Sequence, residues 1–246
     1  MFKSRRRNSV TAQGKGSTMR EKRYLIINLK SYRESFGNNA IEIGKHSFEA
    51  SKKFGVEVVV CPPIPWLNAV AETGATVFAQ HCDSHEPGPF TGFTSPEMIS
   101  ASGGRGVLVN HSEHRIKLAD IESIVEKSRA LQLIALVCAD TPGSVAAVSA
   151  LHPDLVAIEP PELIGTGISV SKARPEVITK SIQSVRQISG ETPVIAGAGI
   201  TSAADVRKAY ELGASGALVA SAIVKSNDRR ELIFSMCQEL SSAEIK

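Results

Sequence analysis

Eight short apolar segments recur along the chain, each four to six residues long and apolar at nearly every position. Strands that are buried on both faces have this near-continuous apolar character, whereas strands with one face in water alternate between apolar and polar residues. We therefore predict eight strands, over 24–28, 56–60, 75–80, 106–110, 133–138, 155–159, 193–198 and 216–220.

Amphipathic segments with helix start and stop signals lie between several of these strands. Asp120 and Ser202 are typical N-cap residues, and Pro175 suits the first turn of a helix. Gly213 suits a position just beyond a helix end. We predict helices over 41–54, 120–133, 175–188 and 202–213.

The alternation of strand and helix predicts parallel strands joined by crossover helices. An open doubly wound sheet and a closed (β/α)8 barrel both satisfy this rule. An open sheet that binds a dinucleotide usually has a G-x-G-x-x-G loop after its first strand, and "NLKSYRESFGNN" (28–39) has no such loop. Eight units in about 225 residues fit the closed barrel, which typically needs about 250. We therefore predict a single-domain α/β fold, a (β/α)8 barrel over residues 19–246.

The basic charge of the chain is concentrated before the first apolar segment. Residues 1–18 contain five basic residues and no acid, whereas the whole chain has a formal net charge of +3, so the remainder carries −2. A segment of this composition cannot form a core. We predict that residues 1–18 are a disordered basic extension or a tag. A nucleic-acid interaction would depend on Arg5, Arg6 and Arg7 alone, so we predict no nucleic-acid partner.

Apolar run lengths and cysteine spacing bear on the cellular compartment. No stretch approaches the ~18 consecutive apolar residues of a transmembrane helix, so we predict no membrane partner. Cys61, Cys82, Cys138 and Cys237 are widely spaced, with no C-x-x-C pair. We predict unpaired thiols and a reducing, cytoplasmic environment.

Chemistry in a (β/α)8 barrel lies at the C-terminal ends of the strands. Asn28 and Lys30 follow the first predicted strand and point to the same side, because side chains alternate with period two. His111 follows the fourth strand, and Glu159 ends the sixth. Each residue alone has an ordinary structural explanation, such as a solvated lysine. Together, a carboxylate, an imidazole and an ammonium group on one face can abstract a proton beside the carbonyl of an anionic substrate.

Several motifs that occur in order along the chain resemble those of a known enzyme family. They are "NLK" (28–30), "AQH" (79–81), "TGFTS" (91–95), "NHSEHR" (110–115), "EPPELIGTG" (159–167) and "AGAGI" (196–200). By these motifs, residues 23–240 resemble the triosephosphate isomerases, specifically the short form found in archaea. The resemblance implies a TIM barrel that interconverts dihydroxyacetone phosphate and D-glyceraldehyde 3-phosphate through an enediolate, in glycolysis and gluconeogenesis. It also implies a homodimer or homotetramer and a reaction without a cofactor.

The resemblance also carries the roles known for this family to residues of this chain. Glu159 corresponds to the base that moves a proton between C1 and C2, and His111 to a neutral electrophile that polarises the carbonyl. Lys30 corresponds to the cation that stabilises the enediolate and the phosphate, with Asn28 positioning the substrate beside it. Glu113 corresponds to a supporting acid paired with Lys30. A helical turn that begins after His111 would favour the uncharged ring.

The phosphate is expected on backbone amides at loop and helix starts rather than on arginines. Segment 160–167 resembles the mobile lid of the family, with prolines at one end and glycines at the other. The chain departs from longer relatives at three positions. Leu29 and Glu162 stand where those relatives have tryptophan, and Gly199 stands where many have serine. We also expect Leu29 in the substrate site. The expected phosphate donors are Ile164, Gly165, Gly199, Ala220 and Ser221.

Two other functions are compatible with a barrel of this kind. Another phosphate-binding enzyme, such as an amino-sugar phosphate isomerase or a prenyl transferase, would share the glycine turns but not the motifs at 28–30 and 110–113. A non-catalytic scaffold would be expected to lose Glu159 or His111, and both are present.

The longest loop on the active face, residues 81–95, is more readily explained as a contact with a second subunit than as a metal site. The loop resembles the arm that contacts a second subunit in the family. His81, Cys82 and His85 are potential metal ligands, but no fourth ligand is evident, so we predict no metal site.

Overall fold

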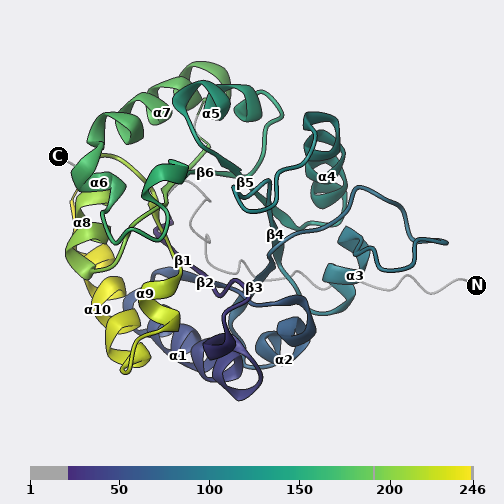
Figure 1. Ribbon diagram of the computed structural model, residues 1–246, viewed down its shortest axis with the longest axis horizontal. Helices are drawn as coiled ribbons and strands as arrows, with labels where there is room; N and C mark the ends of the chain where they lie inside the picture. The colour runs from purple at the N-terminus through teal and green to yellow at the C-terminus, as the bar shows by residue number, and fades with distance from the viewer. Residues whose placement is uncertain (1–21, 191, 245–246) are drawn as a thin grey trace, which may run out of the picture.

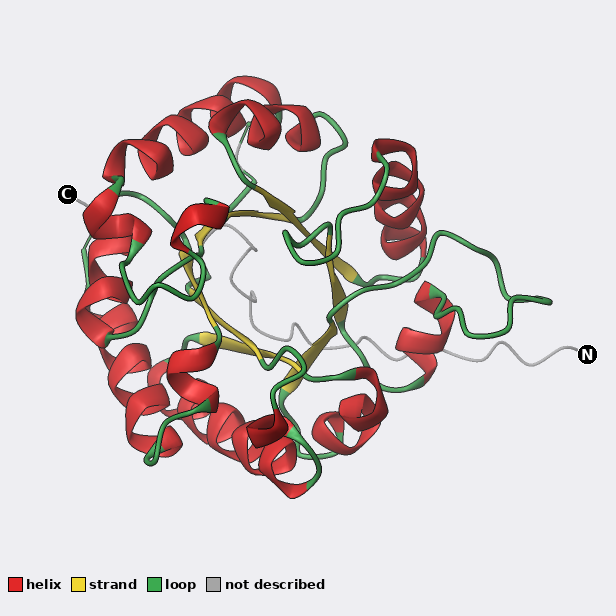
Figure 2. Ribbon diagram, viewed as in Figure 1, coloured by secondary structure: helices red, strands yellow, loops and turns green. Residues whose placement is uncertain are grey.

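The computed structural model describes residues 22–190 and 192–244, so the extension predicted over 1–18 lies outside the described residues. Eight parallel strands close into a barrel, in which each strand pairs with the next and β1 pairs with β8. Figure 2 shows the strands as an inner ring and the helices as an outer ring. The predicted (β/α)8 barrel is confirmed. The strands are β1 (Tyr24–Asn28), β2 (Glu57–Cys61), β3 (Thr76–Ala79), β4 (Gly106–Val109), β5 (Ile134–Ala139), β6 (Leu155–Ile158), β7 (Val194–Ala196) and β8 (Gly216–Val219).

Helices of very different lengths surround the barrel (Figure 1). Within residues 22–190 and 192–244, none is long and apolar enough to cross a membrane. The helices are η1 (Arg33–Ser35), α1 (Asn38–Phe54), η2 (Ile64–Trp66), α2 (Leu67–Ala71), α3 (Pro96–Ala101), α4 (Leu118–Ala130), α5 (Pro142–Ser149), η3 (Pro161–Leu163), α6 (Val170–Ala173), α7 (Pro175–Ile188), α8 (Ala203–Glu211), α9 (Ser221–Val224) and α10 (Arg229–Ser242).

Of the three helix starts with a predicted signal residue, two are as expected and one is not. α7 begins at Pro175 as predicted, and Ser202 caps α8 by accepting a hydrogen bond from the N–H of Asp205. Asp120 is not an N-cap, because α4 begins two residues earlier with Lys117 at the cap position. The carboxylate of Asp120 instead accepts a hydrogen bond from the hydroxyl of Ser84 at 2.9 Å.

The apolar core forms two layers, one inside the barrel and one between the barrel and the helices. Alternation along each strand separates the two sets, because successive side chains point to opposite faces. On β1, for example, Ile26 belongs to the inner cluster and Ile27 to the outer one. The inner cluster consists of Tyr24, Ile26, Val59, Cys61, Phe78, Leu108, Leu136, Cys138, Leu155, Ala157, Ile195 and Leu218.

The same alternation places polar residues above the inner cluster, at the C-terminal end of the barrel. Asn28 lies two residues beyond Ile26, and Glu159 two residues beyond Ala157. Side chains that would continue the inner layer therefore become the floor of the candidate site.

Candidate active site

Glu159 directly follows β6 and is almost completely buried at the mouth of the barrel. Its backbone N–H donates to the carbonyl of Ala139 at 2.8 Å, so the pairing of β5 and β6 still holds it in place. Its side chain is 4% exposed. A Cβ atom on Gly197 would come within 2.4 Å of Cγ of Glu159. The position of this carboxylate therefore requires glycine at residue 197.

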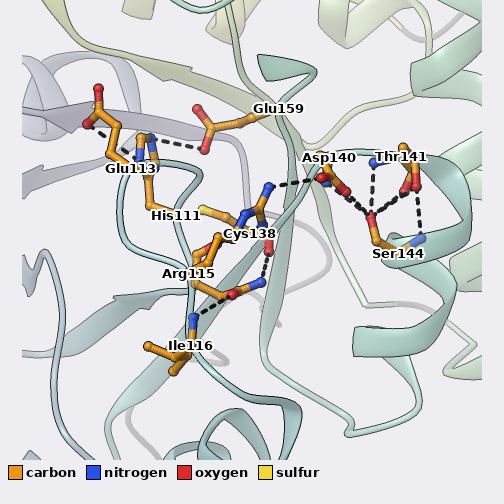
Figure 3. Close-up of polar contacts among 10 residues, drawn as sticks. His111, Glu113, Arg115, Ile116, Cys138, Asp140, Thr141, Ser144 and Glu159 are labelled. Carbon is orange, nitrogen blue, oxygen red and sulfur yellow. Dashed lines mark hydrogen bonds and ion pairs between the residues drawn. The ribbon is translucent and has the colours of Figure 1, made fainter. Parts of the chain in front are cut away.

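His111 follows β4 and faces Glu159 (Figure 3). Nε2 of His111 lies 3.5 Å from Oε2 of Glu159. This distance exceeds a normal N–H···O hydrogen bond, so the contact is electrostatic. On the other side of the ring, the backbone N–H of Glu113 donates to Nδ1 at 3.2 Å. Because that contact needs a lone pair on Nδ1, we assign the ring proton to Nε2, which faces Glu159.

The helical turn expected directly after His111 is a single hydrogen-bonded turn that no helix continues. Residues 112–114 form a single turn, in which the N–H of His114 donates to the carbonyl of His111 at 2.8 Å. The next helix, α4, begins at Leu118. The backbone amide of Glu113, rather than a helix dipole, therefore favours the neutral ring.

Lys30 is held above β1 by three separate contacts. Its backbone N–H donates to Oδ1 of Asn28 at 3.0 Å, and its carbonyl accepts from the side-chain amide of Gln80 at 3.0 Å. These bonds hold a left-handed backbone with a φ of 48°, which is uncommon for a lysine. Nζ of Lys30 lies 2.7 Å from Oε1 of Glu113. Gln80 is a supporting residue that sequence reasoning missed, although it lies within the quoted motif "AQH".

Leu29 does not belong with the other residues expected in the site. It is fully buried in the outer cluster, between the barrel and the helices. Asn28 and Lys30 point toward the barrel mouth, so period-two alternation directs the intervening Leu29 the opposite way. The expectation that Leu29 contacts substrate is therefore wrong, and its role is to pack the outer core.

Two opposing effects set the charge of Glu159. Burial raises the pKa of Glu159, but the contacts with His111 and Cys138 and the charge of Lys30 outweigh burial, so its pKa lies below the ordinary value. The carboxylate is therefore ionised, and able to accept a proton, at neutral pH. Burial and the neighbouring Glu159 raise the pKa of Cys138 well above its ordinary value, so the sulfur keeps its proton and can donate it to the carboxylate. Sequence reasoning treated Cys138 only as a buried thiol.

Two adjacent cavities meet at Lys30 and Tyr32, which line both of them. One cavity, of about 470 Å³, is bounded by Asn28, His111 and other residues of the first four units. The other, of about 240 Å³, is bounded by Glu159 and by all five residues expected to bind phosphate: Ile164, Gly165, Gly199, Ala220 and Ser221. Residues from β1, β4, β6, β7 and β8 thus converge on one small polar site.

Comparison with known proteins identifies the family to which this barrel belongs. The family model described as triosephosphate isomerase matches residues 23–238. The chain belongs to the triosephosphate isomerase family. The resemblance inferred from the six motifs is confirmed.

Curated triosephosphate isomerases from archaea are similar over most of this chain. The enzyme from Methanopyrus kandleri is 44% identical over 88% of this chain and 97% of its own length. The enzyme from Sulfolobus acidocaldarius is 45% identical over 85% of this chain and 91% of its own length. The crystal structure of triosephosphate isomerase from Bartonella henselae superposes with a TM-score of 0.70 at 16% identity, over 89% of this chain and 98% of that one. The fold is thus retained at low sequence identity.

Residues 168–170, directly after the segment that resembles the lid of triosephosphate isomerases, pack against the turn after β7. The N–H of Val170 donates to the carbonyl of Ala198 at 3.2 Å. Gly199 has a φ of 68°, and a Cβ atom there would lie 1.9 Å from the carbonyl oxygen of Ile168. Glycine at residue 199 therefore lets Ile168 lie directly on this turn. Glu162 forms an exposed ion pair with Arg174 at the start of α7.

The loop 81–95 projects from the ring of helices (Figure 2). His81 stacks on His114 with ring centroids 4.0 Å apart, whereas His85 stacks on Phe90 at 4.3 Å. The two histidines therefore contact different neighbours. Within residues 22–190 and 192–244, no group of three or more His, Cys, Asp or Glu residues is placed to hold a metal ion.

Proposed function

We propose that this chain interconverts dihydroxyacetone phosphate and D-glyceraldehyde 3-phosphate by moving a proton between C1 and C2 through an enediolate. Glu159 accepts the proton from one carbon and returns it to the other. Nε2–H of His111 donates to the carbonyl oxygen, on which negative charge develops, and the imidazole passes the substrate's hydroxyl proton from one oxygen to the other, so that the hydroxyl of one carbon becomes the carbonyl of the product. Substrate and product are isomers, so the reaction needs no oxidant or reductant to balance.

One observation carries this proposal: each of the two reacting groups is buried and has one polar atom without a protein hydrogen-bond partner. Nε2 of His111 and Oε2 of Glu159 are among the few buried polar side-chain atoms, in the described part of the chain, that have none. Buried polar atoms normally have a partner, because leaving one unsatisfied costs ~1–3 kcal/mol. A substrate with an acidic C–H beside a carbonyl would give each of these atoms the partner it lacks.

The charged groups of the substrate match the remaining parts of the site. Nζ of Lys30 would lie beside the enediolate oxygens and the phosphate, since Lys30 lines both cavities. We propose that the phosphate lies in the smaller cavity and accepts hydrogen bonds from backbone N–H groups near Gly165, Gly199 and Ser221. Asn28 orients the loop of Lys30 and lies at the edge of the larger cavity, where it positions the substrate.

Replacing Gly199 by alanine should weaken substrate binding more than it slows the chemical step. The new methyl group would overlap the carbonyl of Ile168, and the left-handed backbone would also be strained. We expect KM to rise by about tenfold, or about 1.4 kcal/mol of binding free energy, because the clash displaces backbone amides proposed to hold the phosphate. Steady-state kinetics with varied dihydroxyacetone phosphate measure this change.

Gly55→Ala is a matched control for this substitution. Gly55 has a similar φ of 66°, but a Cβ atom there would meet nothing within 4 Å. It follows α1 at the opposite end of the barrel from the site. The control should lower the melting temperature and leave KM unchanged. Equal KM values for the Gly199→Ala variant and the wild type would contradict the proposed phosphate binding at the turn that Gly199 and Ile168 form.

We also propose that the chain is a homo-oligomer, a dimer or a tetramer, in which loop 81–95 contacts a second copy. Phe90 and Phe93 are 40% and 45% exposed on this loop, and their rings lie together, so they offer a second copy an apolar surface. Light scattering on the purified chain measures the state, and a monomer at micromolar concentration would contradict the proposal.

The environment proposed for the chain is the cytoplasm, with residues 1–18 outside the catalytic domain. All four cysteines are buried as unpaired thiols, which is typical of a reducing compartment. The extension is proposed from its composition alone.

A coupled enzyme assay tests the proposed activity directly. Purified protein should convert dihydroxyacetone phosphate to glyceraldehyde 3-phosphate, detected by oxidation or reduction of a nicotinamide in the coupling step, after dialysis against a chelator. The Glu159→Gln protein serves as the background control. The absence of turnover by the wild-type protein at micromolar concentration would remove the proposal.

A further inference from the structure

Asn110, the residue that directly precedes His111, has an unusual backbone conformation. Its φ is 60°, in the left-handed region that residues other than glycine rarely adopt. Five such residues occur in the described part of the chain, and Lys30, Asn110 and Ala198 all follow strands on the face of the site. Backbone strain of this kind persists only where surrounding contacts hold it, and it gathers at functional sites.

The side-chain amide of Asn110 makes two hydrogen bonds that hold this conformation. Nδ2 donates to the carbonyl of Cys138 at 3.0 Å, and Oδ1 accepts from the backbone N–H of Ile116 at 3.2 Å. One bond ties the end of β4 to the end of β5, and the other closes the loop that contains His111. A glycine could adopt the same φ but could make neither bond.

Arg115 fixes the same loop from outside. Its Nη1 donates to the backbone carbonyl of Asn110 at 3.0 Å, and its Nη2 lies 3.2 Å from Oδ2 of Asp140 (Figure 3). A hydrogen bond from Ser144 and the charge of Arg115 hold the pKa of Asp140 below its ordinary value despite partial burial, so the pair stays charged. Ser144 belongs to the capping box of α5, which makes it a rigid anchor.

Cys138 joins this network to the base. Its carbonyl accepts a hydrogen bond from the side-chain amide of Asn110, and its thiol lies against Glu159 (Figure 3). The end of β5 therefore lies between the loop of His111 and the carboxylate of Glu159. Any movement of the β4 end relative to β5 would change the distance of 3.5 Å between Nε2 and Oε2.

We propose that Asn110 is a positioning residue for the isomerisation: its side-chain amide fastens the loop of His111 to the carbonyl of Cys138 and so sets the separation of the electrophile and the base. This proposal depends on the proposed function. Asn110 acts through His111 and does not itself touch the substrate.

Asn110→Gly tests the proposal, because glycine permits the left-handed backbone and removes only the two side-chain bonds. We expect kcat to fall by about tenfold, since a misplacement of 1 Å in a catalytic group can cost ~10²-fold and partial relaxation costs less. KM should stay within about twofold of the wild type, because the residues proposed to bind phosphate follow β6, β7 and β8. A kcat within twofold of the wild type, or a KM that rises as much as kcat falls, would overturn the proposal.

Gln132→Gly is the matched control. Gln132 also has a left-handed backbone, with a φ of 58°, but it precedes β5 at the opposite end of the barrel. Its kcat should equal that of the wild type, and an equal loss in both variants would show a general effect of glycine. If Asn110→Gly does not fold, Asn110→Asp keeps the acceptor for Ile116 and removes the donor to Cys138. It should then show the same fall in kcat at constant KM, and wild-type values for it would overturn the proposal.

The wild-type rate, measured in the same assay, separates this inference from the proposed function. An inactive wild-type protein would contradict the function itself. An active wild type with an unaffected Asn110→Gly variant would contradict only the positioning role.

Discussion

Glu159→Gln protein should fold normally and isomerise triose phosphate at least ~10²–10⁴ times more slowly than the wild type, the range that a positioned general base supplies. Glutamine keeps the shape of the side chain, so Gly197 can still pack against it. It lacks the ionised carboxylate that the depressed pKa of Glu159 maintains at neutral pH. The measurement is kcat in the coupled assay, with circular dichroism to verify the fold.

Glu122→Gln is a suitable control, because Glu122 is exposed on α4, outside the site. It should retain the wild-type rate. If Glu159→Gln were nearly as active as this control, Glu159 could not be the base, and the proton would have to move through another group. KM should change little in either variant, since neither substitution touches the residues proposed to bind phosphate.

His111→Leu should lower kcat by about 10²–10³-fold, the typical loss when one hydrogen-bond donor to a developing oxyanion is removed. The leucine side chain fills similar space but cannot donate to the carbonyl oxygen. His111→Gln restores an N–H donor on the side chain and should recover part of the rate. Steady-state kinetics on both variants, with thermal melting to check stability, measure the effect.

His46→Gln provides the comparison for this pair. His46 lies on α1, where its nearest charged partner is Glu42 at 3.6 Å, and it has no contact with the site. Full activity is expected. A His111→Leu protein that matched it in kcat would show that the carbonyl is polarised by another group, for which Lys30 is a candidate because it lines both cavities.

Sequence patterns were sufficient to predict the barrel and to identify the main polar residues of the site. The strands were recognisable because burial on both faces requires apolar residues at nearly every position, as in "YLIIN" and "LVAI". The motifs around Asn28, His111 and Glu159 then indicated the family, since each lies where a strand meets its loop. Both inferences use information that is local in the chain.

Local information was misleading where a side chain or an amide makes a contact that the pattern does not encode. Leu29 adjoins two site residues in the sequence, yet alternation directs it into the outer core. The neutral ring of His111 is favoured by one backbone amide, that of Glu113, where the dipole of a helical turn was expected. Gln80 and Asn110 stood in recognised motifs, but their bonds to Lys30 and Cys138 join different strands.

The sequence alone therefore determined the eightfold strand–helix repeat, the closed barrel and the residue types at each strand end, because hydrophobic periodicity and short motifs depend only on neighbours along the chain. Only the tertiary structure decided that Nε2 of His111 and Oε2 of Glu159, 48 residues apart, lie 3.5 Å from each other. It also decided that Cys138 and Asn110 lie beside them. Such distances arise from the closure of the barrel, which brings the ends of all strands together at once.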